Sequence, residues 1–216
     1  MVDHKAMRVQ LMDGAIKTVA ERGLEGLTTR SIEQYSDVND AYIYRYFIDK
    51  DDLLTRTYLR EMSHITTIIF ESISKETVNI QSRDKCYEAW NKCNEYLAAN
   101  PNIVKFCLRF RYSTYYLNVL DEIRNERIER ASKEKTIFLP DTNIALIFEI
   151  MVDAILSYNM RIINGELDDT VENSSVFYEM LYDFLSRHVA DTTYSEVPGK
   201  EKMSYLEFYS IVQSWK

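Results

Sequence analysis

Hydrophobic residues recur every three or four positions along most of this chain, which is the spacing of one face of an α-helix. The first such segment covers residues 5–22 and ends at Gly23, a residue type that favours the left-handed conformation that closes helices. Its apolar stripe consists of Val9, Met12, Ile16, Val19 and Ala20. Five glycines and three prolines in 216 residues leave few helix breakers, and no alternating β-branched run predicts a strand. The sequence therefore predicts an all-α protein of about nine or ten helices.

Residues 27–54 combine two short helix patterns, a polar break between them and a third pattern that starts at once. Ile43 and Phe47 stand four positions apart, so both face inward from the second helix, which we expect over residues 40–47. Val38 is the apolar residue of the polar break and is expected to pack beneath the turn. Side-chain oxygens at a helix start accept hydrogen bonds from free backbone amides. The candidate caps are Thr28 or Thr29 for the first helix and Asn39 for the second. This arrangement predicts a helix-turn-helix, whose second helix enters the major groove of DNA.

This stretch resembles the tetracycline-repressor (TetR) family of bacterial transcription regulators. The resemblance covers about residues 7–54. The matching parts are Ala15 to Gly23, Leu27-Thr28-Thr29, Ile32, Val38, Tyr44-Arg45-Tyr46-Phe47, and Lys50 followed by Leu53-Leu54. It implies an N-terminal three-helix DNA-binding domain and a larger C-terminal helical domain that binds a ligand and forms a dimer.

Two roles are expected for side chains around the recognition helix. Tyr44 and Tyr46 suit phosphate contacts through their hydroxyls, and Lys50 lies at a helix start near the DNA backbone. Tyr42 and Arg45 are the expected base readers, because a guanidinium pairs with the edge of guanine. These five residues form the main predicted contact set.

Three more residues complete that set, and they include a departure from the family pattern. Thr29 and the amides of its helix offer a phosphate site, and Asn39 begins the recognition helix. Asp40 either stabilises the helix N-terminus or accepts a hydrogen bond from cytosine. Family members usually have small or basic residues at several positions where this chain differs. These positions are Glu33, Ser36, Asp37, Asp40, Ala41 and Tyr42.

The rest of the chain predicts a helical domain followed by a short tail. A long helix from about residue 50 connects the two domains, and further helices cover residues 83–99 and start again at Asn100-Pro101. Another helix runs to about residue 133, before a loop over 134–141. The predicted division is a helix-turn-helix domain at 1–49, a ligand-binding and dimerisation domain at 50–190, and a tail at 191–216. The tail is either a short extra helix or disordered.

Residues 142–164 form a helix pattern with almost no polar face, which predicts burial on several sides. Glu149 and Asp153 interrupt it, so a membrane span is a poor alternative. With the following helix it resembles the two-helix dimer face of the TetR family, which implies a two-fold homodimer through a four-helix interface. The expected interface residues are Ile147, Met151, Ile155, Phe177, Met180 and Phe184.

Aromatic residues are numerous in the predicted C-terminal domain and suggest an effector pocket there. Each one alone is explained by core packing, but buried tyrosines need hydroxyl partners and the group is large for a small core. The candidate pocket residues are Trp90, Asn94, Phe110, Tyr112, Tyr115, Tyr116, Phe148 and Tyr158. We expect a small hydrophobic or cationic effector. Glu149 and Asp153 face either solvent or the dimer rim, or one of them meets a cationic ligand.

The charge distribution is unusual for a DNA-binding chain. The net charge is −8, and residues 1–50 carry seven Lys or Arg against eight Asp or Glu. DNA binding therefore requires charge to be segregated by face. Arg30, Arg45 and Lys50 are expected to face phosphates, and Asp13, Glu21 and Glu25 to point away.

Residues that could support catalysis or hold a metal are scattered. The three histidines, His4, His64 and His188, have no nucleophile or carboxylate at motif spacing, and no phosphate loop is present. Three cysteines, Cys86, Cys93 and Cys107, lack a histidine at zinc-ligand spacing and are expected to be packing residues. We therefore predict no enzyme activity, no cofactor and no metal. With no apolar signal segment or membrane span, we expect a soluble, cytoplasmic protein.

These observations predict a DNA-binding transcriptional repressor that binds a palindromic operator as a dimer and is released by an effector. The alternative is a helical small-molecule-binding or protein-interaction module whose DNA binding is weak or lost, which accounts better for the acidic recognition region. Binding to a random DNA duplex at low salt separates the two.

Overall fold

The computed structural model describes residues 4–73, 83–121, 125 and 142–188 of the chain. Its N-terminal part, residues 4–49, is called the head. It contains α1 (His4–Arg22), α2 (Thr29–Ser36), a single 3-10 turn η1 (Asp40–Tyr42) and α3 (Ile43–Tyr46). No strand is assigned in the described part of the chain, and the protein is all-α as predicted.

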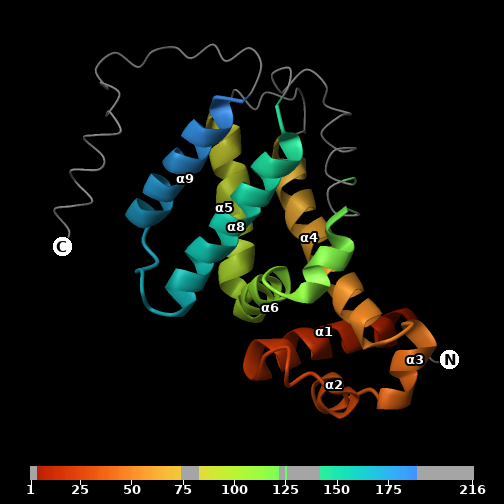
Figure 1. Cartoon of the computed structure of the whole chain (residues 1–216). Helices are drawn as coiled ribbons and strands as arrows, with labels where there is room; N and C mark the ends of the chain where they lie inside the picture. The colour runs from red at the N-terminus through yellow and green to blue at the C-terminus, as the bar shows by residue number, and fades with distance from the viewer. Residues whose placement is uncertain (1–3, 74–82, 122–124, 126–141, 189–216) are drawn as a thin grey trace, which may run out of the picture.

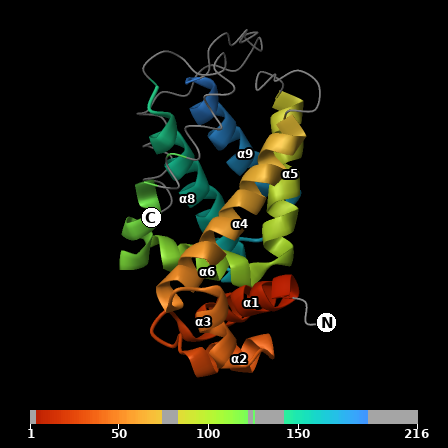
Figure 2. The ribbon, with the colours of Figure 1, turned by 90° about the vertical axis from the view of Figure 1, so that its right-hand side faces the viewer.

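The remaining helices form the bundle. These are α4 (Lys50–Ile73), α5 (Arg83–Ala99), α6 (Pro101–Arg111), α8 (Ile144–Ile163) and α9 (Val171–Ser186), with further helical residues at 114–121. Figures 1 and 2 show the head below the bundle, with α6 lying across the base of the bundle against α1. The long helix α4 starts in the head and rises through the bundle, packing on α1 and on α5. A shift of the bundle therefore has two direct routes to the head, through α4 and through α6.

One cluster of buried apolar side chains runs through both parts. In the head it includes Ile32, Ile43 and Phe47, which are at most 3% exposed. Along α4 the buried side chains continue from Leu53 to Ile65. The inward positions of Ile43 and Phe47 confirm the i, i+4 prediction.

The predicted caps of the helix-turn-helix are present. Thr28 is the N-cap of α2: its hydroxyl accepts a hydrogen bond from the Ser31 amide at 3.0 Å. Asn39 caps the next element, its Oδ1 accepting from the Ala41 amide at 3.1 Å. Asp37 adopts φ 56°, the left-handed conformation that a glycine usually provides in this turn. The turn therefore keeps its shape without the glycine.

Some local predictions were wrong. The recognition element is not one helix over 40–47 but the 3-10 turn η1 followed by α3, and Phe47 is extended. Val9 is 40% exposed, although its stripe partners are buried. Asn100 was also expected to cap the helix that starts at Pro101, but it makes no cap hydrogen bond, and its Nδ2 donates to the Tyr96 carbonyl instead. At the start of α8 the cap is Asn143, which accepts from the Leu146 amide at 3.0 Å.

The predicted loop over 134–141, the helix beyond residue 121 apart from residue 125, and the tail at 191–216 lie outside the described residues. Among the helices that are described, none is long and apolar enough to cross a membrane.

Candidate nucleic-acid interface

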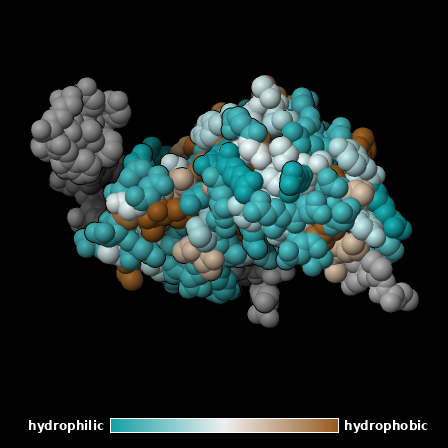
Figure 3. All heavy atoms as spheres, turned by 90° about the horizontal axis from the view of Figure 1, so that it is seen from below, coloured by the Kyte–Doolittle hydropathy of each residue, from teal (hydrophilic) through white to brown (hydrophobic). Residues whose placement is uncertain are grey.

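The recognition element divides its side chains between the head core and the surface. Ile43 and Phe47 are buried, whereas Tyr44 is 65% exposed and Arg45 is exposed. The rings of Tyr42 and Tyr46 stack with centroids 6.4 Å apart, and the Arg45 guanidinium lies 5.9 Å from the Tyr42 ring. The outward face thus combines cationic and aromatic side chains, which suit both phosphates and base edges. Figure 3 shows this end of the molecule from below, where hydrophilic residues predominate.

Several predicted contact residues are already hydrogen-bonded within the head. The Tyr46 hydroxyl lies 2.6 Å from His4 Nδ1, which ties α3 to the start of α1. Lys50 Nζ donates to the Leu27 carbonyl at 3.2 Å. Both side chains are therefore positioned by the head, and neither is a freely moving surface group.

Acidic partners occupy the α2 side of the recognition element. Thr29 donates its hydroxyl proton to Asp40 Oδ2 at 3.1 Å, and Asn39 Nδ2 donates to Glu33 Oε1 at 3.2 Å. Two of the predicted DNA contacts, Thr29 and Asn39, thus already donate side-chain hydrogen bonds to carboxylates of the protein. Negative charge is concentrated on this side of the recognition element.

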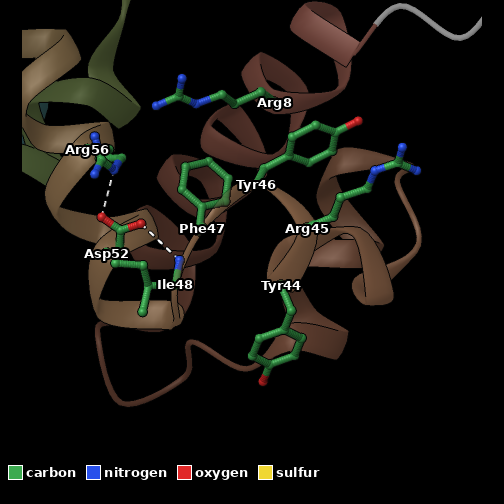
Figure 4. A pocket seen from close by; sticks show the side chains of 8 residues that line it. All are labelled: Arg8, Tyr44, Arg45, Tyr46, Phe47, Ile48, Asp52 and Arg56. Atoms are coloured by element: carbon green, nitrogen blue, oxygen red, sulfur yellow. Dashed lines mark hydrogen bonds and ion pairs between the residues drawn. The ribbon is translucent and has the colours of Figure 1, made fainter.

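A basic cleft lies on the other side of the recognition element, between α1, α3 and the first turns of α4 (Figure 4). Its volume is about 460 Å³. The lining residues are Arg8, Tyr44, Arg45, Tyr46, Phe47, Ile48, Asp52 and Arg56. Sequence analysis did not predict Arg8 and Arg56 as site residues. The Asp52–Arg56 spacing on α4 was a readable signal for a helical ion pair, but no local pattern relates Arg8 to Arg56.

Residues 11–57, which span α1 through the start of α4, match the family model of bacterial regulatory proteins of the tetR family. This match and the similar proteins described next support a DNA-binding transcriptional regulator of the TetR family, and residues 11–57 contain its helix-turn-helix.

Over most of its length the chain is similar to known bacterial regulators. The fatty acid metabolism regulator protein of Bacillus subtilis is 24% identical over 188 residues, which cover 80% of this chain and 92% of that protein. A TetR-family regulator from Marinobacter aquaeolei has the same fold, with a TM-score of 0.65 at 19% identity over 87% of this chain and 97% of the other. Bacillus subtilis FadR, solved in complex with stearoyl-CoA, matches with a TM-score of 0.55 at 23% identity over 81% and 97% of the two chains.

The bundle contains a second pocket, of about 540 Å³, between α6, the helical residues 114–121 and α8. It is lined by Arg111, Tyr112, Tyr116, Leu120, Asn143, Leu146, Glu149 and Asp153. Of the eight predicted pocket residues, only Tyr112 and Tyr116 line it. Tyr112 is 77% exposed and Tyr116 is 8% exposed.

The other six predicted pocket residues do not line this pocket, and three of them belong to the core. Trp90 packs edge-on against Tyr158, and its indole N–H donates to the Ser174 hydroxyl at 2.8 Å. Phe110 is fully buried and stacks on Tyr58 with centroids 4.6 Å apart. Trp90, Phe110 and Tyr158 are at most 5% exposed and pack in the core, so their role in ligand binding stays a prediction.

The rest of that group lies away from the pocket lining. Tyr115 stacks on Phe110 with centroids 6.4 Å apart, Phe148 is half-buried, and Asn94 lies on α5 with a buried Oδ1 that has no hydrogen-bond partner within the described structure. The aromatic surplus therefore divides into a core cluster and a pocket wall. Composition alone could not separate them.

Arg111 is the centre of a hydrogen-bonded network at this pocket. Its Nε donates to Asp153 Oδ1 at 2.6 Å, its Nη2 to Glu149 Oε2 at 2.8 Å, and its Nη1 to the hydroxyls of Tyr58 and Tyr116 at 2.9 and 3.1 Å. The side chain is 3% exposed. Glu149 and Asp153 therefore pair with a buried protein cation, which was not among the predicted alternatives.

Electrostatics within this network follow from burial and pairing. Burial is the largest influence on Arg111 and by itself would lower the pKa, but the bond to Asp153 and the two tyrosines raise the pKa overall. Burial also raises the pKa of Tyr58, against the opposing charge of Arg111. The network therefore keeps a charged guanidinium and a neutral phenol in contact at neutral pH.

The predicted dimer residues also divide between core and surface. Ile147 and Ile155 are 4% and 5% exposed, and Phe177 stacks on Tyr158 with centroids 4.4 Å apart. Ile147 and Ile155 are thus buried within the protomer and Phe177 is half-buried, and the interface role of all three stays a prediction. Met180 is 58% exposed, and Met151 and Phe184 are half-buried. The exposed apolar residues on these two helices that sequence analysis missed are Leu146, Ile150, Val171 and Val176.

Proposed function

We propose that the protein is a transcriptional repressor that binds a palindromic operator as a homodimer and leaves it when a small molecule occupies the bundle. The observation that carries this proposal is the divided recognition element, with Ile43 and Phe47 in the core and Tyr44 and Arg45 outside. Such a surface can enter the major groove without disturbing the packing that holds it.

The proposed roles follow the exposure of each side chain. Arg45, with Tyr42 beneath its guanidinium, reads base edges. Tyr44, Tyr46 and Lys50 bind phosphates and fix the register of the head on the duplex. The residues on the α2 side are Thr29, Asn39 and Asp40. We propose that they set the shape and local charge of the recognition element and contact DNA at its N-terminal end.

We propose that dimerisation uses the outer faces of α8 and α9. Four large apolar side chains there, Leu146, Ile150, Val176 and Met180, are 44–58% exposed, and exposed apolar patches mark association surfaces. A two-fold axis brings two heads into position for half-sites separated by about one helical turn or a multiple.

The pocket beside Arg111 is the proposed effector site. Arg111 connects α8 to Tyr58 of α4, the helix that starts in the head, and Arg109 of α6 donates to the Val19 carbonyl of α1. A ligand that prefers one arrangement of these contacts shifts the spacing of the heads. The related FadR structure contains stearoyl-CoA. Here the guanidinium donors of Arg111 are already bonded to protein, and the pocket lining has two carboxylates against one arginine, so a small hydrophobic or cationic effector fits better than a polyphosphate.

DNA binding is tested by fluorescence anisotropy with a random duplex at low salt, followed by selection of the preferred sequence. We expect binding, and a selected site with two-fold symmetry. Tyr44→Phe with Lys50→Ala should weaken binding to all sequences alike. Arg45→Ala should instead reduce the preference for the correct base at one position of the site, by about 1–3 kcal/mol of binding free energy. A folded dimer that fails to bind any duplex at low salt would support the alternative, an interaction module without DNA binding.

Effector binding is tested through tryptophan fluorescence. The variant Trp215→Phe leaves Trp90 as the sole reporter. Candidate ligands are dodecyltrimethylammonium, dodecanol and stearoyl-CoA at equal concentration. A compound that shifts the Trp90 emission should also lower DNA affinity; a shift without any change in DNA affinity would reject the regulatory step.

A further inference from the structure

We infer that the basic cleft beside the recognition element is a separate binding site for a phosphodiester of the DNA backbone, held by Arg8 and Arg56. The inference rests on the proposed DNA-binding function and adds a contact from outside the helix-turn-helix itself. Arg8 comes from α1 and Arg56 from the second turn of α4, so the site exists only when these two helices pack together.

The cleft is basic on a chain that is otherwise acidic. Its lining contains three arginines and one aspartate, whereas the whole chain has a net charge of −8. Figure 4 shows the guanidinium of Arg8 extended toward the side where Arg56 lies, and both arginines line the cleft together with Phe47. Arg45 points to the opposite side in the same view. Two guanidiniums are thus available to one bound anion.

Arg8 is exposed and lies against the Phe47 ring, with its guanidinium carbon 5.6 Å from the ring centroid. A cation–π contact of this kind uses the face of the guanidinium and leaves its N–H edges free to donate. No carboxylate pairs with Arg8 in the described part of the chain. Its donors are therefore available to a phosphate.

Arg56 is oriented by a short relay on α4. Its Nε donates to Asp52 Oδ1 at 2.6 Å, while Asp52 Oδ2 accepts from the Ile48 amide at 3.0 Å. Asp52 thus holds the side chain by its Nε, and both terminal nitrogens remain directed away from that bond. An arginine fixed in this way presents a preformed pair of donors, which matches the geometry of phosphate oxygens.

The opposite side of the recognition element explains why such a site is needed. There, Thr29 donates to Asp40 and Asn39 donates to Glu33, so phosphates that pass that side meet carboxylates. Backbone affinity must then come from the cleft side. This segregation of charge also resolves how a head with slightly more acids than bases can bind DNA.

The test measures DNA affinity over a salt series for Arg8→Gln, Arg56→Gln and the double variant, on two duplexes of unrelated sequence. Each single change should weaken binding about five- to tenfold on both duplexes and lower the slope of log K against log salt by about one. Arg8→Lys keeps the charge and should recover most of the slope. Arg161→Gln makes the same charge change on α8, where the side chain is 62% exposed, and should leave the slope unchanged.

The outcomes separate this inference from the proposed function. If the native protein binds DNA and the double variant keeps the native slope, the cleft site is wrong while the proposed function stands. If the native protein binds no duplex, the proposed function fails. A thermal melt with sodium phosphate against sodium chloride at equal ionic strength adds a second arm. Phosphate stabilisation that the double variant loses without any change in DNA affinity would identify a site for free anions and overturn the assignment to DNA.

The variants must first be shown to fold, because Arg56 also pairs with Asp52. Circular dichroism melts give this control. Arg8→Gln removes no hydrogen bond or ion pair within the described structure, so it tests the site even if Arg56→Gln lowers the melting temperature. An unchanged slope for a fully folded Arg8→Gln would by itself overturn the role of Arg8.

Discussion

The core of the head and the core of the bundle are held together by different chemistry. In the head, the buried polar side chains are small hydroxyls such as Thr18, which donates to the Gly14 carbonyl of its own helix at 2.8 Å. In the bundle, the buried guanidinium of Arg111 bonds to tyrosine hydroxyls and to the carboxylates of Glu149 and Asp153, whose side chains are 13% and 40% exposed. The stabilisation from apolar burial does not depend on the orientation of the side chains. A buried charge, in contrast, is stable only when all of its hydrogen-bond partners are in place.

This difference indicates where the regulator can change shape. The head can shift as a unit, because its apolar packing has one close-fitting arrangement. The bundle contains a network whose members come from α4, α6 and α8, and any ligand that moves Glu149 or Asp153 alters what Arg111 holds. The network is thus the expected origin of a change in the spacing of the heads.

The largest effect is expected from Arg111→Met, which removes the centre of the bundle network. Glu149, whose side chain is 13% exposed, would remain charged without its partner. Removing one member of a buried pair typically costs about 3–5 kcal/mol in the free energy of unfolding. Urea unfolding measures this loss of stability. Adding Glu149→Gln to the variant should recover part of the lost free energy of unfolding.

The matched control is Arg161→Met on α8, the helix that carries Glu149. Arg161 pairs with Glu166 at 3.3 Å, with side chains 62% and 50% exposed, and an exposed pair contributes about 0–1 kcal/mol. Equal losses for Arg111→Met and Arg161→Met would show that the buried network has no special role, and the comparison between the two cores would fail.

A somewhat smaller loss is expected from Ile43→Ala in the head. The side chain is fully buried, and such a truncation costs about 2–4 kcal/mol through lost burial and the cavity that remains. Because the core is continuous from head to bundle, unfolding followed by circular dichroism and by Trp90 fluorescence should coincide. A separate early transition of the head would instead show two independently stable parts.

The buried thiols of the bundle predict a fall in stability at alkaline pH. Burial raises the pKa of Cys86 to about 11 and that of Cys93 to about 12, from 9.0. Above pH 9 the unfolded chain loses these protons while the folded chain keeps them. Stability is therefore complete below pH 9 and should fall by about 1.4 kcal/mol per thiol for each further pH unit, up to the folded pKa. Urea midpoints between pH 8 and 10.5 measure this, and Cys86→Ala with Cys93→Ala should flatten the decline.

The smallest effect is expected from the two adjacent threonines of the head. Thr28→Ala removes the α2 cap and should cost about 1 kcal/mol. Thr29→Ala removes only the bond to Asp40, at a half-buried position, so a smaller loss is expected. The opposite order in thermal melts would mean that the helix start is misassigned.

Several features of this protein were determined by the sequence alone, and all of them are local. The cap at Thr28 acts across three residues, and the inward pair Ile43 and Phe47 is four positions apart. The limits of α5, Arg83–Ala99, also match the prediction. Such features depend on hydrogen bonds and periodicity within one or two helical turns, and the spacing of residues in the sequence therefore predicts them. The TetR resemblance rested on this same local pattern.

The partners of charged and aromatic side chains were decided only by the tertiary structure. Helix α8 is apolar nearly all round, so its periodicity could not orient it; packing against α5 and α6 buried Ile147 and Ile155 and left Leu146 and Ile150 exposed. Arg8 and Arg56 are brought to one cleft by the crossing of α1 and α4. A contact between distant residues depends on how whole helices cross, and the spacing of residues along one helix carries no information about that crossing.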